Sequence, residues 1–299
     1  MVASFSSVIF DDLNSSVQTC NPVSKAGAGR FHDLNKKPPA TKKAEQRMKA
    51  SLKTTVMKSS LALAAAVAMS VGSQSAQANN LLGIDVSSYQ GSPNWTSVAG
   101  CGPKYAFVKA TEGNYYQDSV YNSDMSNGKA AGLQMGAYDF CRPDQISPAT
   151  EANYFWAFAG SKITTDGKSL YPMADFEVFG GHVGATTYTA WFNAWSADVK
   201  AKKTTFMHPV IYCSAGTGAC DLNTGITLSA WIANYNGGNL YTGHPWTCCT
   251  SCNAWGPGTG NNWTYWQVSS TGAICGISGN VDLDAYPLSL SELIAYQGL

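Results

Sequence analysis

Short apolar segments that alternate with helix-like stretches constrain the fold of this 299-residue chain more than any other feature. Each segment has the length of a strand, and most end on a polar or aromatic side chain. The segments cover residues 81–87, 105–111, 133–140, 170–177, 209–213, 230–235, 265–269 and 280–286. Helices are predicted over residues 117–131, 147–159 and 186–202. This order favours an α/β fold with a parallel sheet or barrel, in which the complement of helices is incomplete toward the end.

Residues 1–78 lack this pattern and are predicted to be a leader. Basic residues precede an apolar run over residues 61–71, and Ala76-Gln77-Ala78 follows it, which is the pattern of a secretory signal peptide. The run is shorter than the ~20 apolar residues of a membrane span. We therefore expect a signal peptide at residues 48–78 and a secreted, extracellular domain at residues 79–299.

Residues 1–47 precede this signal and show no helical or strand period. We expect them to be a disordered upstream extension, with translation starting at Met48 or Met57; an unusually long leader is the alternative. Delivery to a lysosome or phagosome would also fit the signal peptide. Two glycosylation sequons, at Asn94 and Asn262, agree with secretion and are expected on surface loops.

Removing the leader changes the charge of the chain. The whole sequence has 19 basic and 19 acidic residues; residues 79–299 keep nine basic and fifteen acidic ones, a net charge of −6. An acidic surface argues against a nucleic-acid partner. It also predicts an acidic activity optimum on anionic polymers, because the negative charge weakens as the pH falls.

Eight of the nine cysteines follow the leader, and an even number behind a signal peptide indicates disulfides. A local bridge between Cys213 and Cys220 is one expectation, and pairing among the late cysteines is another; the connectivity stays open. The late cysteines are Cys248, Cys249, Cys252 and Cys275. A zinc site in the first three of them is the alternative. The histidines form no metal-binding set, and we expect neither a metal nor a cofactor.

Asp175 and Glu177 are the strongest candidates for catalysis. They close the fourth apolar segment with Phe176 between them, so in a strand both carboxyl groups point to one face. Adjacent like charges raise the pKa of one member, which can then act as a general acid near neutral pH. Taken alone, the motif is better explained by two solvent-exposed acids at the end of a strand.

Polar residues at the ends of the other segments are expected to lie near these two acids. In an α/β barrel the active site lies at the carboxyl ends of the strands, where these side chains would converge. The polar or aromatic strand ends are Asp85, Lys109, Tyr138, Tyr235, Gln267 and Asp282. Trp231, Tyr235 and Trp266 lie near such ends and could stack on sugar rings, although most aromatic residues must fill the core.

Several motifs resemble glycoside hydrolase family 25, the Chalaropsis-type lysozymes or N-acetylmuramidases. The first is Asp85-Val86-Ser87-Ser88-Tyr89-Gln90-Gly91, followed by Phe107-Val108-Lys109-Ala110-Thr111-Glu112-Gly113, Tyr116 and Asp118. The later ones are Gly136-Ala137-Tyr138, Ala174-Asp175-Phe176-Glu177, Trp231-Ile232-Ala233-Asn234-Tyr235, Trp266-Gln267 and Val281-Asp282-Leu283. The resemblance covers nearly all of residues 79–299, in the same order.

The resemblance implies an irregular, flattened, TIM-like barrel that cleaves the β-1,4 bond between N-acetylmuramic acid and N-acetylglucosamine in bacterial peptidoglycan. Separately, we expect the protein to be a monomer. By analogy Glu177 is the general acid/base, and Asp175 positions the substrate's N-acetyl group as the nucleophile, which gives retention. Asp85 joins them as a catalytic acid, and a direct nucleophilic role of Asp85 or Asp175 stays open. The substrate-binding residues are then Asp282, Tyr138, Tyr235, Trp231, Gln267 and Gln90.

Two features depart from the family pattern. Asp139 replaces the histidine that usually follows the third-strand tyrosine, and we expect it to add an acid near the site. The cysteine-rich insertion over residues 241–260 is also unusual. The competing interpretations are a chitinase-like glycosidase and a non-catalytic sugar-binding protein on the same scaffold, although none of Asp85, Asp175, Glu177 and Asp282 is lost.

Overall fold

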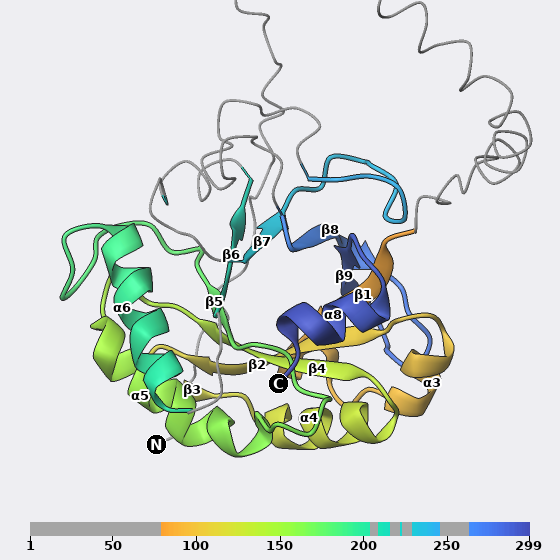
Figure 1. Cartoon of the computed structure of the whole chain (residues 1–299), viewed down its shortest axis with the longest axis horizontal. Coiled ribbons are helices and arrows are strands. Elements are labelled where there is room, and N and C mark those ends of the chain that lie inside the picture. Colours follow the sequence, from red (N-terminus) through yellow and green to blue (C-terminus); the bar gives the residue numbers. More distant parts are fainter. Residues whose placement is uncertain (1–78, 204–208, 216–221, 223–228, 246–262) are drawn as a thin grey trace, which may run out of the picture. The chain divides into compact units, whose positions relative to one another are not determined.

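The computed structural model describes residues 79–203, 209–215, 222, 229–245 and 263–299. Within them, strands close into a barrel (Figure 1). The strands are β1 (Leu81–Val86), β2 (Tyr105–Glu112), β3 (Tyr116–Gln117), β4 (Gln134–Phe140), β5 (Met173–Asp175), β6 (Val210–Ser214), β7 (Ala230–Ala233), β8 (Tyr265–Gly272) and β9 (Val281–Tyr286). The expectations for residues 1–78, Asn262, Cys220, Cys248, Cys249 and Cys252 lie outside the described residues.

The strand order shows that the sheet is closed and that it contains both parallel and antiparallel pairs. The sheet runs β1-β9-β8-β7-β6-β5-β4-β2-β3, and β1 also pairs with β2, so all strands except the appended β3 form a closed ring. Six neighbouring pairs, from β1–β2 to β7–β8, are parallel. Strand β9 is antiparallel to both β8 and β1. The predicted α/β barrel is confirmed, and its last strand reverses direction.

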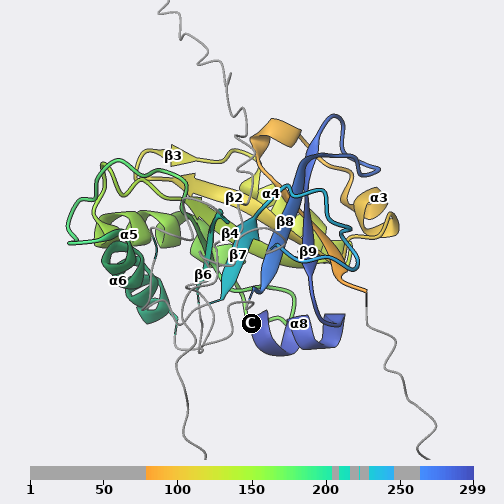
Figure 2. The same ribbon diagram turned by 90° about the horizontal axis from the view of Figure 1, so that it is seen from above.

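Helices cover the outside of the barrel incompletely (Figure 2). They are α3 (Trp95–Gly100), α4 (Tyr121–Ala130), α5 (Pro148–Ala159), α6 (Tyr188–Ala201) and α8 (Leu290–Gln297), with short 3-10 turns η1 (Ser88–Gln90) and η2 (Gly160–Lys162). Helix α5 packs against α6 and β2, and α4 packs against β2 and β4. Among the described residues, no helix has both the length and the apolar character needed to cross a membrane.

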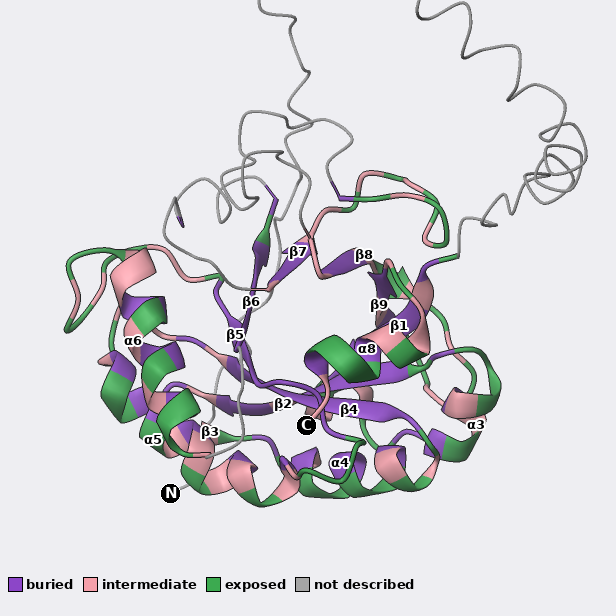
Figure 3. Ribbon diagram, in the orientation of Figure 1, coloured by how far each residue is buried: buried purple, intermediate pink, exposed green. Residues whose placement is uncertain are grey.

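Aromatic rings fill the interior, and the strands are buried along most of their length (Figure 3). The Phe107 ring lies 4.6 Å from that of Trp231 and 4.9 Å from that of Tyr265, between ring centroids. Gly83 and Gly136 leave room for these rings, since a Cβ atom would lie 2.2 Å from the Tyr105 ring at Gly83 and 2.6 Å from the Phe107 ring at Gly136. The core therefore depends on glycine at both positions.

Some element boundaries differ from the predictions. The helix expected over residues 117–131 begins at Tyr121, because Tyr116–Gln117 pairs with β2 as β3. The strand expected over residues 170–177 is only Met173–Asp175, so Glu177 follows it. Helices α3 and α8 were not predicted. Helix α5 begins as expected, with Ser147 as its N-cap and Pro148 in its first turn.

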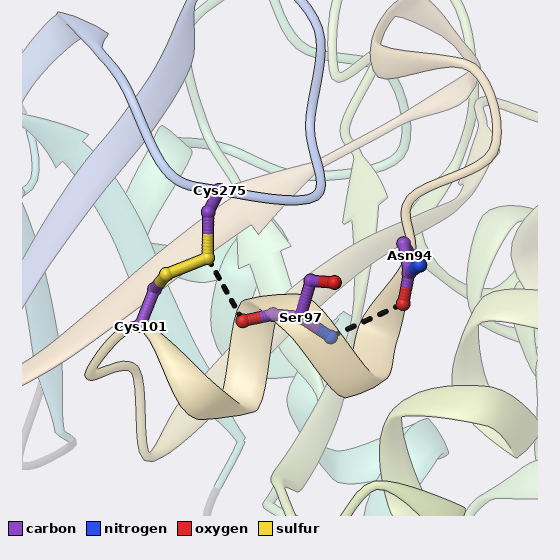
Figure 4. Close-up of a disulfide and its surroundings, with 4 residues drawn as sticks. All are labelled: Asn94, Ser97, Cys101 and Cys275. Carbon is purple, nitrogen blue, oxygen red and sulfur yellow. Dashed lines mark hydrogen bonds between the residues drawn. A yellow bond between two sulfur atoms is a disulfide. The ribbon is translucent and has the colours of Figure 1, made fainter.

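A disulfide joins Cys101 to Cys275, 174 positions apart in the sequence (Figure 4). Cys101 caps the end of α3, and Cys275 lies in the turn between β8 and β9, with its sulfur 3.0 Å from the Ser97 carbonyl oxygen. The expectation that Cys275 pairs with the late cysteines is therefore wrong. Cys213 is buried with a free thiol, and its expected partner Cys220 lies outside the described residues.

Candidate active site

A pocket of about 260 Å³ opens at the carboxyl ends of the barrel strands. Most of its lining side chains come from the last residues of a strand or the residues just after it. They are Asp85, Ser87, Lys109, Tyr138, Phe140, Asp175, Glu177, Tyr212, Trp231, Tyr235, Gln267 and Asp282. The convergence expected from the strand ends is therefore present, and it includes eight of the nine predicted site residues.

Asp175 and Glu177 face the pocket from the same side of the chain. Phe176 between them is fully buried among the rings of α6 and the loop after β5, as strand alternation requires. Asp175 is buried, with 7% of its surface exposed, whereas Glu177 is open to solvent. The two carboxyl groups thus differ in access, and Glu177 is the more exposed of the two.

The two carboxyl groups hold protons more strongly than free acids. Burial, followed by the negative charge of Glu177, raises the pKa of Asp175 well above its usual value. The enclosing pocket also raises the pKa of Glu177, while hydrogen bonds with Asp175 and Tyr212 limit the rise. Because ionisation of one carboxyl group disfavours ionisation of its neighbour, the pair is expected to retain a proton at pH values where isolated carboxyl groups have lost theirs.

Asp85 and Asp282 form the opposite side of the pocket. They are directly paired residues of the antiparallel strands β1 and β9. Burial, followed by the charges of Asp282 and Asp284, raises the pKa of Asp85. Burial and the charge of Glu177 raise the pKa of Asp282 to about 6. Four acids therefore surround one small volume, and this concentration of negative potential favours a cationic transition state.

Gln267 on β8 holds the Asp85 carboxylate. Its Nε2 donates a 2.8 Å hydrogen bond to Oδ2 of Asp85. Its Oε1 accepts from the hydroxyls of Tyr212, at 2.8 Å, and Tyr235, at 2.7 Å. Gln267 is only 4% exposed. Besides lining the pocket, it holds neighbouring side chains in place through hydrogen bonds, a role that the strand-end pattern does not predict.

Aromatic side chains form the floor and the rim. Tyr138 and Trp231 are almost fully buried and meet edge to face, with ring centroids 6.4 Å apart. The Tyr235 ring is 54% exposed and forms part of the rim. An exposed ring over an acidic floor can stack on the apolar face of a sugar.

Lys109 is the one cationic side chain among the residues that line this pocket. Its Nζ lies 3.0 Å from Oε2 of Glu112 and 4.6 Å from the centroid of the Phe140 ring. Its positive charge lowers the pKa of both Asp175 and Glu177. Lys109, Tyr212, Ser87 and Phe140 were not among the predicted site residues, although Lys109 carried the same strand-end signal as those that were.

Three expected residues lie elsewhere. Gln90 is outside the pocket lining and caps η1, where its Oε1 accepts from the Ser87 backbone amide at 2.9 Å. Trp266 is fully buried and donates from Nε1 to the Asn234 carbonyl oxygen. Asp139 points away from Tyr138 into the protein, and accepts from Thr111 at 2.6 Å and Trp195 at 3.0 Å. Asp139 therefore adds no acid to the pocket lining.

Among the described residues, one group of three side chains could together bind a metal ion. Atoms of Asp139, Cys141 and Glu151 lie within 4.8 Å of one another, all buried. This group lies behind β4, outside the pocket. Both Asp139 oxygens already accept hydrogen bonds from Thr111 and Trp195, and burial raises the pKa of Glu151 to about 9. Burial therefore favours the protonated form of Glu151 at neutral pH, and both Asp139 oxygens are engaged by neutral donors.

The barrel and its carboxyl-lined pocket define a glycoside hydrolase, in which carboxyl groups supply both the proton and the charge stabilisation. The profile of glycosyl hydrolases family 25 matches residues 84–277, and the chain belongs to this family.

Individual relatives agree with this assignment. Lysozyme M1 of Streptomyces globisporus is 32% identical over 236 residues, which are 74% of this chain and 72% of the relative. An N,O-diacetylmuramidase of Chalaropsis sp is 28% identical over 219 residues, which are 67% of this chain and 95% of the relative. The crystal structure of a bacterial lysozyme from Streptomyces coelicolor superposes with a TM-score of 0.60 at 32% identity, covering 73% of this chain and 97% of that chain.

Proposed function

We propose that the protein is a secreted lysozyme that hydrolyses the β-1,4 bond between N-acetylmuramic acid and N-acetylglucosamine in bacterial peptidoglycan. The observation that carries this proposal is the Asp175–Glu177 pair at the end of β5, opposite Asp85 and Asp282 in one pocket. The names of the relatives support the substrate class.

Asp175 and Glu177 differ in solvent exposure, and we assign them different roles on this basis. Glu177 is open to the pocket, so its proton can be donated to the oxygen of the leaving sugar. Asp175 is buried beside it and orients the N-acetyl group of the substrate, whose carbonyl oxygen attacks the anomeric carbon. The C–O bond to the leaving sugar breaks as the new bond forms, and Glu177 then takes a proton from the water that opens the intermediate. Two displacements give net retention.

The remaining residues bind sugar and stabilise charge. The Asp85 and Asp282 carboxyl groups favour the oxocarbenium-like transition state. Tyr138 contacts the N-acetyl group, while Trp231, Tyr235 and Gln267 contact the sugar rings and hydroxyls. The domain acts as a monomer without a cofactor. Secretion follows from the signal peptide predicted at residues 48–78, and the Cys101–Cys275 disulfide suits an oxidising compartment.

The test is clearing of a suspension of bacterial cell walls by the wild type, by Glu177→Gln and by Glu292→Gln. Glu292 is an acid of α8 that caps its own helix through Ser289, which glutamine can also do. We expect Glu177→Gln to lose at least about 100-fold in rate, as the general acid contributes this much, and Glu292→Gln to keep the wild-type rate. Undiminished clearing by Glu177→Gln would contradict the mechanism.

A second assay tests the identity of the substrate. Purified peptidoglycan and chitin are digested side by side, and the reducing ends are identified. Release of muramic-acid ends from peptidoglycan supports a muramidase, whereas faster release from chitin supports a chitinase-like glycosidase. Binding to either polymer without release by the wild type would indicate a non-catalytic sugar-binding protein. An optimum in acid is expected from the net charge of −6 over residues 79–299.

A further inference from the structure

Asp284 is a buried acid directly beneath the active site. It lies two residues after Asp282 on β9, on the same face of the strand, and is fully buried. It does not line the pocket. Its Oδ1 accepts a 2.8 Å hydrogen bond from Nε1 of Trp231, a residue of the pocket floor. Its Oδ2 has no N–H or O–H donor within hydrogen-bond distance among the described residues.

Within the described part of the chain, no positively charged side chain is found to act on Asp284. The titratable groups that face it are Asp85 on β1, Asp282 on its own strand, and the tyrosines Tyr105 on β2 and Tyr265 on β8. The hydroxyls of Tyr105 and Tyr265 are themselves buried without a hydrogen-bond partner among the described residues. An ionised carboxylate in this position would be a buried charge without a counter-ion, which is costly.

Asp85 provides the missing partner. In the β1–β9 register, Asp85 is paired with Asp282, so Asp284 is its diagonal neighbour on the same face, and the two side chains are within hydrogen-bond reach. Asp85 accepts one side-chain hydrogen bond from Gln267, at its Oδ2. A proton on Oδ2 of Asp284 would satisfy this atom and give the Asp85 carboxyl group a second donor.

We propose that Asp284 is a positioning residue: a neutral carboxylic acid that donates a hydrogen bond to Asp85 and accepts one from Trp231. It thereby fixes an acid and an aromatic ring of the active site in one arrangement. Burial is the largest influence on Asp284 and raises its pKa well above the usual value, whereas the hydrogen bonds with Trp231 and Asp85 lower it. The geometry of Oδ2, which lies beside Asp85 and is unpartnered among the described residues, carries the inference, and not this pKa. The inference rests on the proposed function only where it concerns the rate of hydrolysis.

Asparagine is the direct test, because it reproduces the protonated acid. In Asp284→Asn the amide oxygen can accept from Trp231 and the amide nitrogen can donate to Asp85. Asp284→Leu has a similar volume and can do neither. We expect Leu to lower kcat by about 10-fold or more, with a smaller effect on KM, and Asn to restore most of the rate. The Asn variant should also stay active to higher pH than the wild type. Folding of both variants is checked by circular dichroism.

A second measurement does not depend on activity. The melting temperatures of the wild type and Asp284→Asn are compared between about pH 5 and pH 9, with Asp198→Asn as a control on the outer helix α6. A pKa raised by folding makes stability fall as the pH rises, and asparagine cannot titrate. We therefore expect a smaller alkaline loss of stability for Asp284→Asn than for the wild type and the control.

The outcomes separate the two proposals. An Asn variant as impaired as the Leu variant, or an unchanged alkaline loss of stability, would show that Asp284 is ionised and overturn the inference. A Leu variant with wild-type kcat and pH profile would also overturn it. If the wild type hydrolyses no glycan but the Asn variant shows the smaller alkaline loss, the proposed function fails while the protonated Asp284 stands.

Discussion

The hydroxyl of Tyr212 donates a 2.8 Å hydrogen bond to Oε1 of Gln267, which in turn donates from Nε2 to the carboxyl group of Asp85. Three strands, β6, β8 and β1, are thus linked through one buried amide. Tyr235 donates to the same Oε1 from the loop after β7. The amide cannot rotate without breaking several bonds, so the orientation of Asp85 is set by residues far apart in the sequence.

Replacing Gln267 by leucine should leave Asp85 without this donor. We expect kcat to fall by about 10-fold or more, because a buried carboxyl group without its donor costs roughly 1–3 kcal/mol. Tyr212→Phe removes one of the two donors to Oε1 and also the hydrogen bond with Glu177, so its effect reports on both groups together. Initial rates on purified peptidoglycan measure the effect. Equal kcat in wild type and Gln267→Leu would show that the amide does not hold Asp85.

Lys109→Met should move the pH profile of activity upward. The Lys109 ammonium lowers the pKa of both Asp175 and Glu177, so its removal raises both and keeps the pair protonated to higher pH. Lys109→Arg retains a positive charge and is the matched control. The dependence of kcat/KM on pH, which reports the free enzyme, measures the shift. A methionine variant whose profile coincides with that of the arginine variant would refute this role.

The fold should be more stable in acid than in alkali. Burial raises the pKa of Asp139 to about 7 and that of Glu151 to about 9, above the values expected in an unfolded chain. Stability from such groups is complete below the unfolded-state pKa and is lost as the pH rises through the folded-state values. We expect a melting temperature lower by roughly 5 °C or more at about pH 9 than at about pH 5.

Glu151→Gln tests the source of this loss. Its amide oxygen can keep the hydrogen bond that Oε1 accepts from the Arg142 backbone amide, and its NH2 group replaces the oxygen that has no donor among the described residues. The variant should lose less stability in alkali than the wild type, as measured by thermal unfolding. A parallel loss in both proteins would place the titrating group elsewhere.

The disulfide between Cys101 and Cys275 should contribute to stability without touching the pocket. A link across 174 positions restricts the unfolded chain, and such bridges contribute roughly 2–5 kcal/mol. The double variant Cys101→Ala/Cys275→Ala should unfold at lower urea concentration and keep its activity at room temperature. Ser97→Ala, which keeps the bridge, is the control. Peptide mapping without reduction should recover the two cysteines in one linked fragment, and their recovery in separate fragments would contradict the pairing.

The sequence predicted those parts of the fold and site that depend on neighbouring residues. Apolar length and alternation located the strands, and the spacing of Asp175 and Glu177 put both on one face, with Phe176 turned into the core. Strand ends then predicted most of the pocket, because the carboxyl ends of parallel strands meet at one end of a barrel. Ser147 and Pro148 marked the start of α5 in the same local way.

Contacts between segments far apart in the sequence could not be predicted from the sequence alone. The antiparallel pairing of β9 with β1 puts Asp284 beside Asp85, but alternation alone does not distinguish Asp284 from Asp282. The bridge from Cys101 to Cys275 likewise depends on how α3 and the β8–β9 turn meet in space. Asp139 and Trp266 were misplaced because a strand end next to the pocket still has a face that points into the core.

The closure of the barrel by β9 has a consequence for the order of synthesis. Asp85 belongs to the first strand, whereas Gln267, Asp282 and Asp284, which surround it, belong to the last two. A nascent chain therefore carries Asp85, Asp175 and Glu177 long before the partners of Asp85 exist. The pocket can form only when the final strands have left the ribosome and inserted next to β1.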